Sequence, residues 1–400
     1  MYTKEDVFDF VAEENVKFIR LTYFDVFGLQ KNIAIQPSEL KKAFGPGIVI
    51  DAGAAAGFAN DVHGDLYLRP DPSTFTVLPW RSSDGAVIFM ICDIYYPDGR
   101  IFGGDTRYIL KQAIRKARET GLLIDVGTEF EFYLFHQDKN SINSHVPLDR
   151  GGYMDVAPFD RGEDMRRDIC MTLEEMGLRP QASFHQEGPG QNEIDFHSAP
   201  ALIAADDAAI FKWVVRTTAD MNGLVADFSP KPMEGQPGNC MHMTLKLEPL
   251  GECDLPAMHE AFAAGILAHL KELTVFMNPT LESYKRLGKK KAPLYLTWST
   301  KNRFQLLRIP SNAADRIEVR SPDPLANPYL VIALLIYAGV DGIEKGMKLP
   351  APCDISLSAL QKETGYDSLP ESLEKARALA RNSAVVKEWL PESVIAAYME

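Results

Sequence analysis

Four short segments, far apart in the sequence, contain carboxylate or histidine side chains that could bind a divalent cation. In the segment 127–135 the residues alternate, so a strand there would place Glu129 and Glu131 on one face and Phe130 and Phe132 on the other. The other three segments are residues 191–196, 240–243 and 316–320. Carboxylates, one histidine and arginines together favour a divalent metal with an anionic substrate.

Each segment also has an ordinary structural interpretation. Alternating acids are usually solvated, but the apolar flanks of Glu129 and Glu131 indicate a central strand. A lone histidine is more often a satisfied core or surface group. His242, however, alternates with Met241 and Met243, which predicts that its side chain faces the same way as the acidic side chains.

Arginines accompany these segments. Glu318 and Arg320 would share one face of a strand, either as a simple ion pair or as part of the site. Segments 283–287 and 302–310 supply further guanidinium groups, which suit bidentate recognition of carboxylate or phosphate. The lysine run 289–291 is typical of a solvated loop tip, and the sequence has neither a Walker nor a Rossmann glycine motif. Phosphate binding would therefore depend on metal and arginine.

The elements that must position these residues form two predicted domains, 1–100 and 101–400. The first is a small α+β unit with a helix over 7–14, a hairpin over 17–35 that turns at Gly28, and a strand over 86–92. A helix over 105–121, capped by Asp105, begins the second domain. Further helices are predicted over 163–176, 204–222, 256–276, 325–346 and 372–380.

Composition and charge narrow the class of protein. The chain has 400 residues, 46% hydrophobic and 24% charged, which is typical of a folded globular protein. Its net charge of −13 disfavours nucleic acid or an anionic membrane as partner. No apolar run approaches the roughly 20 residues that span a bilayer, and the acidic N-terminus lacks a signal-peptide core, so we expect a cytoplasmic protein. Five dispersed cysteines without a Cys-x-x-Cys pair argue against disulfides or a thiolate metal site.

Taken in order, six motifs resemble the glutamine synthetase family, of the bacterial type I kind. They are Gly-Thr-Glu-Phe-Glu-Phe-Tyr-Leu-Phe at 127–135, Gly-Pro-Gly-Gln-Asn-Glu-Ile-Asp-Phe at 188–196, Ser-Pro-Lys-Pro-Met then Met-His at 229–242, Asn-Pro-Thr-Leu-Glu-Ser-Tyr-Lys-Arg-Leu at 278–287, Asn-Arg then Arg-Ile-Pro at 302–310, and Ile-Glu-Val-Arg-Ser-Pro-Asp-Pro-Leu-Ala-Asn-Pro-Tyr at 317–329. The resemblance runs from about residue 15 to the C-terminus.

The resemblance implies a fold and an assembly. The fold would be α+β, with a small N-terminal β-grasp-like domain and a larger catalytic domain whose curved antiparallel sheet is flanked by helices. The assembly would be a homo-oligomer, a dodecamer of two hexameric rings in which neighbouring subunits share active sites.

The resemblance also implies a role for each candidate residue. One metal ion would be bound by Glu131 and Glu193, and a second by Glu129, His242 and Glu318. Glutamate would be bound by Arg286, Arg320, Gly238 and Glu131. Arg303 and Arg308 would contact the phosphates and the transition state, and Asp51 would help to bind ammonium. The implied cofactors are ATP and Mg²⁺ or Mn²⁺. The γ-phosphoryl group would move to the γ-carboxylate of glutamate, and ammonia would attack the γ-glutamyl phosphate to give glutamine, ADP and phosphate.

One departure from the family pattern concerns the metal. Where the family has a further metal-binding glutamate in a His-His-Glu pattern, this chain has Gln186, and Glu187 follows one place later. A step of one residue reverses side-chain direction in a strand, so Glu187 would replace that ligand only if a bulge intervenes. The predicted metal ligands include Glu187 on this condition, and the sequence indicates a weakened metal site.

A second departure concerns the amine. Lys291 stands where the family has a flap glutamate before Ala-Pro, and a cation there should repel ammonium. Asp51 lies in Asp-Ala-Gly-Ala-Ala in place of Asp-Gly-Ser-Ser, and Pro237 and Lys246 occupy positions that are often asparagine and serine. The chain also lacks the tyrosine-bearing loop that is adenylylated in some relatives.

Three functions follow as alternatives. The first is a glutamine synthetase, the second a relative that ligates an organic amine to a glutamate-like carboxylate, and the third an attenuated regulatory paralogue. Because a buried charge cluster is costly to keep, the retained acidic and arginine residues argue against the third.

Overall fold

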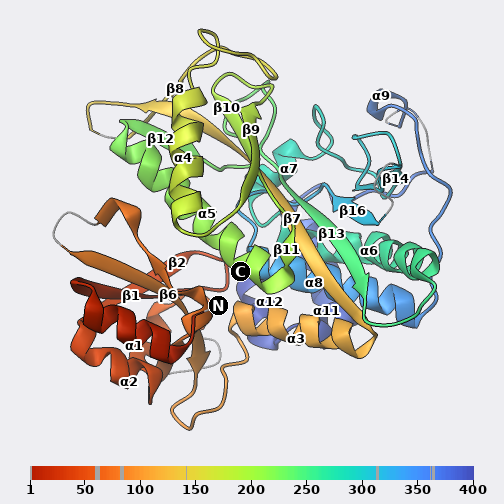
Figure 1. Cartoon of the computed structure of the whole chain (residues 1–400). Coiled ribbons are helices and arrows are strands. Elements are labelled where there is room, and N and C mark those ends of the chain that lie inside the picture. The colour runs from red at the N-terminus through yellow and green to blue at the C-terminus, as the bar shows by residue number, and fades with distance from the viewer. Residues whose placement is uncertain are drawn as a thin grey trace.

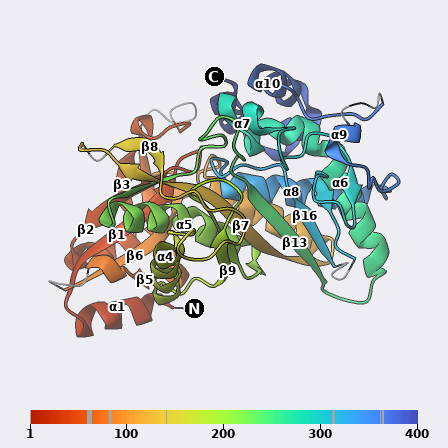
Figure 2. The same ribbon diagram turned by 90° about the horizontal axis from the view of Figure 1, so that it is seen from above.

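The computed structural model contains two sheets, each with its own hydrophobic core (Figure 1). It describes residues 2–58, 64–81, 85–140, 142–311, 315–360, 362 and 365–400. In the views of Figures 1 and 2, the N-terminal unit, coloured red to orange, lies beside the larger unit that the rest of the chain forms. The α+β class predicted from the sequence is confirmed.

The N-terminal sheet has six strands in the order β2-β1-β6-β4-β3, with β5 paired to β6. Its strands are β1 (Val16–Phe24), β2 (Gln30–Ile35), β3 (Ile48–Asp51), β4 (Asp65–Pro70), β5 (Thr76–Val77) and β6 (Ala86–Tyr95). Helices α1 (Lys4–Glu13) and α2 (Leu40–Phe44) contribute Val7, Leu40 and Ala43 to its core. The predicted first helix begins earlier than expected because Thr3 and Asp6 form a capping box.

The larger sheet is built around one long strand, β7 (Leu122–Gln137). Its ten strands follow the order β14-β15-β16-β13-β7-β10-β9, and β8, β11 and β12 also pair with β7. The other bounds are β8 (Asn143–Pro147), β9 (Pro180–His185), β10 (Gln191–Phe196), β11 (Ala199–Pro200), β12 (Leu224–Asp227), β13 (Met241–Pro249), β14 (Trp298–Ser299), β15 (Leu307–Arg308) and β16 (Arg316–Val319). Its strand pairs are antiparallel except for β14 with β15.

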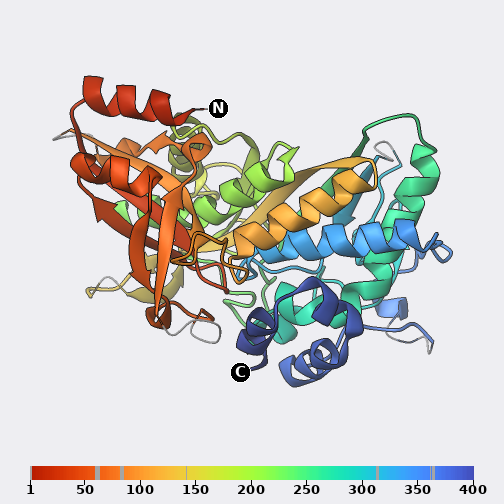
Figure 3. The ribbon, with the colours of Figure 1, turned by 90° about the horizontal axis from the view of Figure 1, so that it is seen from below.

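Helices pack around this sheet. They are α3 (Thr106–Glu119), α4 (Glu163–Glu175), α5 (Ala201–Met221), α6 (Leu255–Met277), α7 (Leu281–Arg286), α8 (Pro328–Glu344), α9 (Leu357–Leu360), α10 (Leu373–Asn382), α11 (Ala384–Trp389) and α12 (Glu392–Met399). Of these, α3, α4 and α5 are in contact with strands of the sheet. In the view of Figure 3, α3 (orange) and α8 (light blue) lie side by side in front of the sheet, and the C-terminal helices α10 to α12 (dark blue) lie at the bottom of the view. The six helices predicted in this part of the chain are present, with ends that differ by a few residues, whereas α7, α9, α11 and α12 were not predicted.

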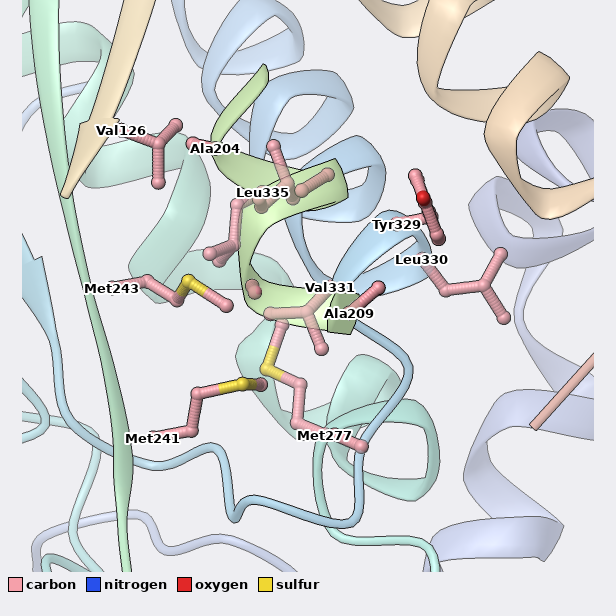
Figure 4. Packing of buried hydrophobic residues seen from close by; sticks show 14 of the residues in the cluster. Val126, Ala204, Ala209, Met241, Met243, Met277, Tyr329, Leu330, Val331 and Leu335 are labelled. Carbon is pink, nitrogen blue, oxygen red and sulfur yellow. The ribbon is translucent and has the colours of Figure 1, made fainter. Parts of the chain in front are cut away.

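The apolar side chains of the central strands face these helices. Met241 and Met243 of β13 point toward Ala209 of α5 and Val331 of α8 (Figure 4). Helices α6 and α8 approach closely at Gly265, where a Cβ atom would lie 2.2 Å from the carbonyl oxygen of Ala338. No described helix combines the length and apolar character needed to cross a bilayer.

A buried ion cluster connects the two units. Arg107 of α3 binds Asp93 through Nη1 at 2.7 Å and Asp71 through Nη2 at 2.9 Å. The same guanidinium binds Asp206 of α5 through Nε at 3.0 Å and Nη2 at 2.9 Å. Tyr329 of α8 also donates to Asp206, at 2.6 Å. The guanidinium thus donates four hydrogen bonds to three carboxylates, which holds α3 and α5 against the N-terminal sheet.

Candidate active site

The acidic side chains meet because the central strands are in register. On β7, Glu129 lies opposite His242 of β13, and Glu131 lies opposite Glu193 of β10. Phe130 and Phe132 are fully buried on the other face. The predicted faces of this strand are thus confirmed, and so is the prediction that His242 points to the acidic side, since its Nδ1 lies 3.1 Å from Glu129 Oε2.

One group of ligand atoms joins three strands. Oxygen or nitrogen atoms of Glu129, His242 and Glu318 all lie within 4.8 Å of one another, on β7, β13 and β16. His242 is only 5% exposed, and its Nε2 has no hydrogen-bond partner. A buried imidazole nitrogen without a partner is costly, and a metal ion would satisfy it. These three residues therefore fit a divalent cation with oxygen and imidazole ligands.

A second group overlaps the first. Glu129, Glu193 and Asp195 also bring ligand atoms within 4.8 Å of one another. The sequence prediction did not include Asp195 among the ligands, although its alternation with Glu193 places the two on one face. Oδ1 of Asp195 is buried without a hydrogen-bond partner. This face of the sheet therefore carries one more acidic group than the six predicted metal ligands include.

Burial and mutual repulsion raise the pKa values of these carboxyl groups. Burial raises the pKa of Glu131 and, reinforced by the charge of Glu131, raises that of Glu193 well above its usual range. Burial and the nearby Glu129 raise the pKa of Asp195 to about 7. Such a face favours a bound cation, because a positive ion lowers the cost of keeping the carboxylates charged.

Glu318 has the opposite environment. Burial would raise its pKa, but Arg320, His242 and Arg308 outweigh burial and lower the pKa to about 2. Arg308 Nη1 donates to Glu318 Oε2 at 2.8 Å, and Arg320 pairs with Glu318 Oε1. Glu318 therefore stays charged, with two guanidinium groups beside it.

The predicted glutamate-binding residues lie in different layers. Arg286 is 1% exposed and donates to Asn278 Oδ1 at 2.9 Å and to Cys240 Sγ at 3.0 Å. Gly238 lies directly over it, since a Cβ atom at Gly238 would be 2.6 Å from Arg286 Cγ. Arg286 thus supports the floor of the site, whereas Arg320 reaches the cavity.

A cavity opens over this face of the sheet. It is lined by Glu129, Glu131, Tyr153, Phe184, Gln186, Glu187, Gln191, Glu193, Pro237, Gly238, Cys240, His242, Lys289, Lys290, Lys291, Ala292, Arg303 and Arg320. Eight of the predicted site residues are among them, whereas Asp51, Arg286, Arg308 and Glu318 are not. The cavity also includes Tyr153 and Phe184, for which the sequence offered no signal.

Lysines lie at the mouth of the cavity. The predicted loop tip 289–291 is exposed, but its three lysines also line the cavity. Lys291 pairs with Glu187, and its Nζ lies 5.5 Å from the centre of the Tyr153 ring. This ion pair connects the loop to the hairpin between β9 and β10, so Glu187 points to the loop and not to the carboxylates.

Asp51 lies away from this cavity, in the N-terminal unit. It is exposed at the end of β3, where its Oδ1 accepts a hydrogen bond from Gly53 N at 2.8 Å. Within one chain, Asp51 therefore does not lie among the candidate metal ligands or in the lining of the cavity.

Comparison with known proteins assigns most of the chain to two conserved domains. Residues 15–97 match the glutamine synthetase β-grasp domain, and residues 103–400 match the glutamine synthetase catalytic domain. The chain is 41% identical to glutamine synthetase of Clostridium saccharobutylicum, over all of this chain and 94% of that protein. It is 39% identical to glutamine synthetase of Staphylococcus aureus strain Mu50, over 97% of this chain and 91% of that protein.

Solved structures give the same picture of the fold. A structure of GmaS in complex with ADP aligns with a TM-score of 0.88 and 29% identity, over 98% of this chain and 94% of that one. GmaS without ligand aligns equally well, with the same TM-score of 0.88.

Proposed function

The chain belongs to the glutamine synthetase family of ligases, and from this premise we propose that it ligates ammonia to the γ-carboxylate of glutamate while ATP is converted to ADP and phosphate. The observation that carries the proposal is the convergence of Glu129, His242 and Glu318 from three strands, with Arg308 and Arg320 beside them. Such a combination could bind the phosphates of a nucleoside triphosphate through a metal ion and a carboxylate substrate through arginine.

The chain's own residues would divide the work. Glu129, His242 and Glu318 would hold Mg²⁺ or Mn²⁺, which when bound supplies positive charge for the ATP phosphates. Arg303 lines the cavity and would contact the phosphoryl group as its negative charge spreads in transfer. Arg320 would orient the glutamate carboxylate, on a floor that Arg286 supports beneath Gly238.

The reaction would proceed in two steps, phosphoryl transfer and then amide formation. A γ-carboxylate oxygen of glutamate attacks the γ-phosphorus of ATP, and ADP leaves. The amine nitrogen then attacks the carbonyl carbon of the γ-glutamyl phosphate, inorganic phosphate leaves, and the nitrogen loses a proton to give the amide. The loop that carries Lys291 would limit access of water to the acyl phosphate, since it already contacts the opposite wall through Glu187.

We further propose a cytoplasmic homo-oligomer with shared sites, a dodecamer of two hexameric rings. Asp51 supports this assembly, because it is exposed on the N-terminal unit and does not line the cavity of its own chain. If Asp51 contributes to ammonium binding, it does so in the cavity of a neighbouring subunit.

A second candidate function is ligation of an organic amine. The observation that favours it is Lys291, which places an ammonium group in the cavity wall where a small cation would have to bind. Lys289 and Lys290 add to the same positive potential. An amine with a larger body could bind against Tyr153 and Phe184 and would depend less on a cation pocket.

The test is phosphate release from ATP with glutamate and Mg²⁺, measured without amine, with ammonium, and with a panel of monoamines, diamines and polyamines. Release with ammonium and matching glutamine formation would support the proposed reaction. Release only with an organic amine would overturn ammonia and support the second candidate. No release with any amine would overturn both.

A further inference from the structure

We propose that Gln186 takes the place of a metal ligand, so that the chain has one tight divalent-cation position and a second that is much weaker. This inference rests on the proposed function, because it concerns the metal ions of the same site. It differs from that proposal in its measurement, which is the number of bound ions and not turnover.

The orientation of the Gln186 amide carries the argument. Its Oε1 accepts a hydrogen bond from the backbone N–H of Glu187 at 2.9 Å, which fixes which end of the amide is oxygen. The NH₂ group therefore faces the two carboxylates, with Nε2 2.8 Å from Glu131 Oε1 and 2.5 Å from Glu193 Oε2. An amide nitrogen is a donor, so the atom that Gln186 offers to this position cannot ligate a metal ion.

The same hydrogen bonds already do part of what a cation would do. Glu131 and Glu193 lie opposite each other on β7 and β10, and the NH₂ group bridges them. The other oxygen of Glu131 accepts from Cys240 N at 2.8 Å. Both oxygens of Glu131 are thus satisfied without an ion, in contrast to His242, whose Nε2 has no partner.

Glu187 does not restore the missing ligand. The register shift between β9 and β10 lies at Asp195 and Phe196, before the regular pairs from Ala182 to His185, so it does not change the direction of Glu187 relative to Gln186. The carboxylate of Glu187 instead pairs with Lys291. Glu187 therefore does not compensate for the change at Gln186, and the position between Glu131 and Glu193 has one anionic ligand fewer.

The experiment titrates Mn²⁺ alone into metal-free protein, with free ion followed by electron paramagnetic resonance and heat by calorimetry. We expect one tight ion per chain in the wild type and a second that binds at least about tenfold more weakly. In Gln186→Glu, which adds the missing carboxylate, the second ion should bind within about tenfold of the first. The matched control is Gln181→Glu, which adds the same charge at an exposed position of β9 and should leave one tight ion.

The remaining outcomes decide the inference. Two equally tight ions in the wild type would overturn it while leaving the proposed ligase reaction intact. A Gln186→Glu variant that is folded by circular dichroism but gains no second ion would also overturn it. If that variant does not fold, the wild-type stoichiometry and Gln186→Ala, which should stay at one tight ion, still decide. Absence of any tight ion in the wild type would overturn both this inference and the metal assignment of the proposed function.

Discussion

Two clusters of buried charged residues in this chain differ in how many of their polar atoms have hydrogen-bond partners. Around Arg107, three aspartates accept four hydrogen bonds from one guanidinium, between 2.7 and 3.0 Å. On the curved sheet, carboxylates converge with raised pKa values, and His242 Nε2 and Asp195 Oδ1 have no partner. The first cluster is complete within one chain, whereas the second leaves buried polar atoms without a partner although Arg308 and Arg320 lie beside it.

This difference separates a structural role from a functional one. A buried ion pair holds a fold when each charge has its partner, and breaking it leaves an uncompensated charge. A cluster with excess negative charge lowers the stability of the folded chain and gains it back when a cation binds. The number of buried charges therefore does not identify a site; here the unsatisfied atoms of His242 and Asp195 lie among the converging carboxylates.

The largest effect is expected from removal of the Arg107 guanidinium. Arg107→Met should lower the free energy of unfolding by about 3–5 kcal/mol, because Asp71, Asp93 and Asp206 lose their common partner. Urea denaturation measures this change. The control is Lys111→Met, on the same helix and also paired to Asp93, where the half-exposed ion pair should contribute less than about 1 kcal/mol. Equal losses in the two variants would contradict the structural role.

On the curved sheet, removal of a charge is expected to raise the free energy of unfolding instead of lowering it. Glu193→Gln removes one of the facing carboxylates and should raise the unfolding free energy of the EDTA-treated protein by about 0.5–2 kcal/mol. The same variant should keep most of the stabilisation that Mn²⁺ and ATP give the wild type, because the tight ion lies at Glu129, His242 and Glu318, as thermal unfolding with and without ligands will show. An exposed change, Glu163→Gln, serves as control. A loss of stability in EDTA would refute the idea that this cluster is overcharged.

A third cluster, between α6 and α8, should respond to pH. His269 contacts Glu272 Oε1 at 2.6 Å and Asp341 Oδ2 at 2.8 Å, and although burial opposes it, these bonds raise the pKa of His269 above 6.5. The folded state thus binds the proton more tightly than the unfolded state. Its contribution, about 1 kcal/mol, is fully present below pH 6.5 and disappears as pH rises through the higher folded pKa.

The measurement compares the wild type with His269→Gln by urea denaturation at several pH values. The wild-type advantage should be largest at mildly acidic pH and shrink under alkaline conditions. It should also shrink in strong acid, because the bonds with His269 help to hold the pKa values of Glu272 and Asp341 below their ordinary 4.5 and 3.8. An advantage that is constant with pH would mean that His269 is not charged in the folded protein.

The smallest effect on stability is expected at Lys291. The ion pair with Glu187 is half exposed, at 52% and 33%, so Lys291→Ala should change the unfolding free energy by less than about 0.5 kcal/mol. The KM for the amine should respond far more, falling for ammonium because a competing cation is removed. Steady-state phosphate release measures this, with Lys285→Ala on the exposed face of α7 as control. An unchanged KM would place the amine elsewhere.

Much of the site could be predicted because alternation is a local property. Glu129 and Glu131 opposite Phe130 and Phe132 follow from the geometry of a strand, and the structure confirms their faces. Asp195 could have been found in the same way, because it alternates with Glu193. The longer helices were also predictable, since caps such as Asp105 at α3 act within a few residues, whereas the short α7, α9, α11 and α12 were missed.

Other features depend on contacts between distant segments and left no local signal. Nothing near Arg107 in the sequence indicates that its partners come from positions 71, 93 and 206. The position of Tyr153 in the cavity wall and the pairing of Glu187 with Lys291 likewise depend on loops that meet only in the folded chain.

The sequence by itself determined the family, the α+β fold and most of the residues that carry negative charge to one face of a strand, because periodicity and ordered motifs are written along the chain. Only the tertiary structure decided which of these charges find partners. Hydrogen bonds and ion pairs act over a few ångströms in space, so the register between β7, β10 and β13 leaves His242 with a free nitrogen while Gln186 satisfies Glu131 and Glu193.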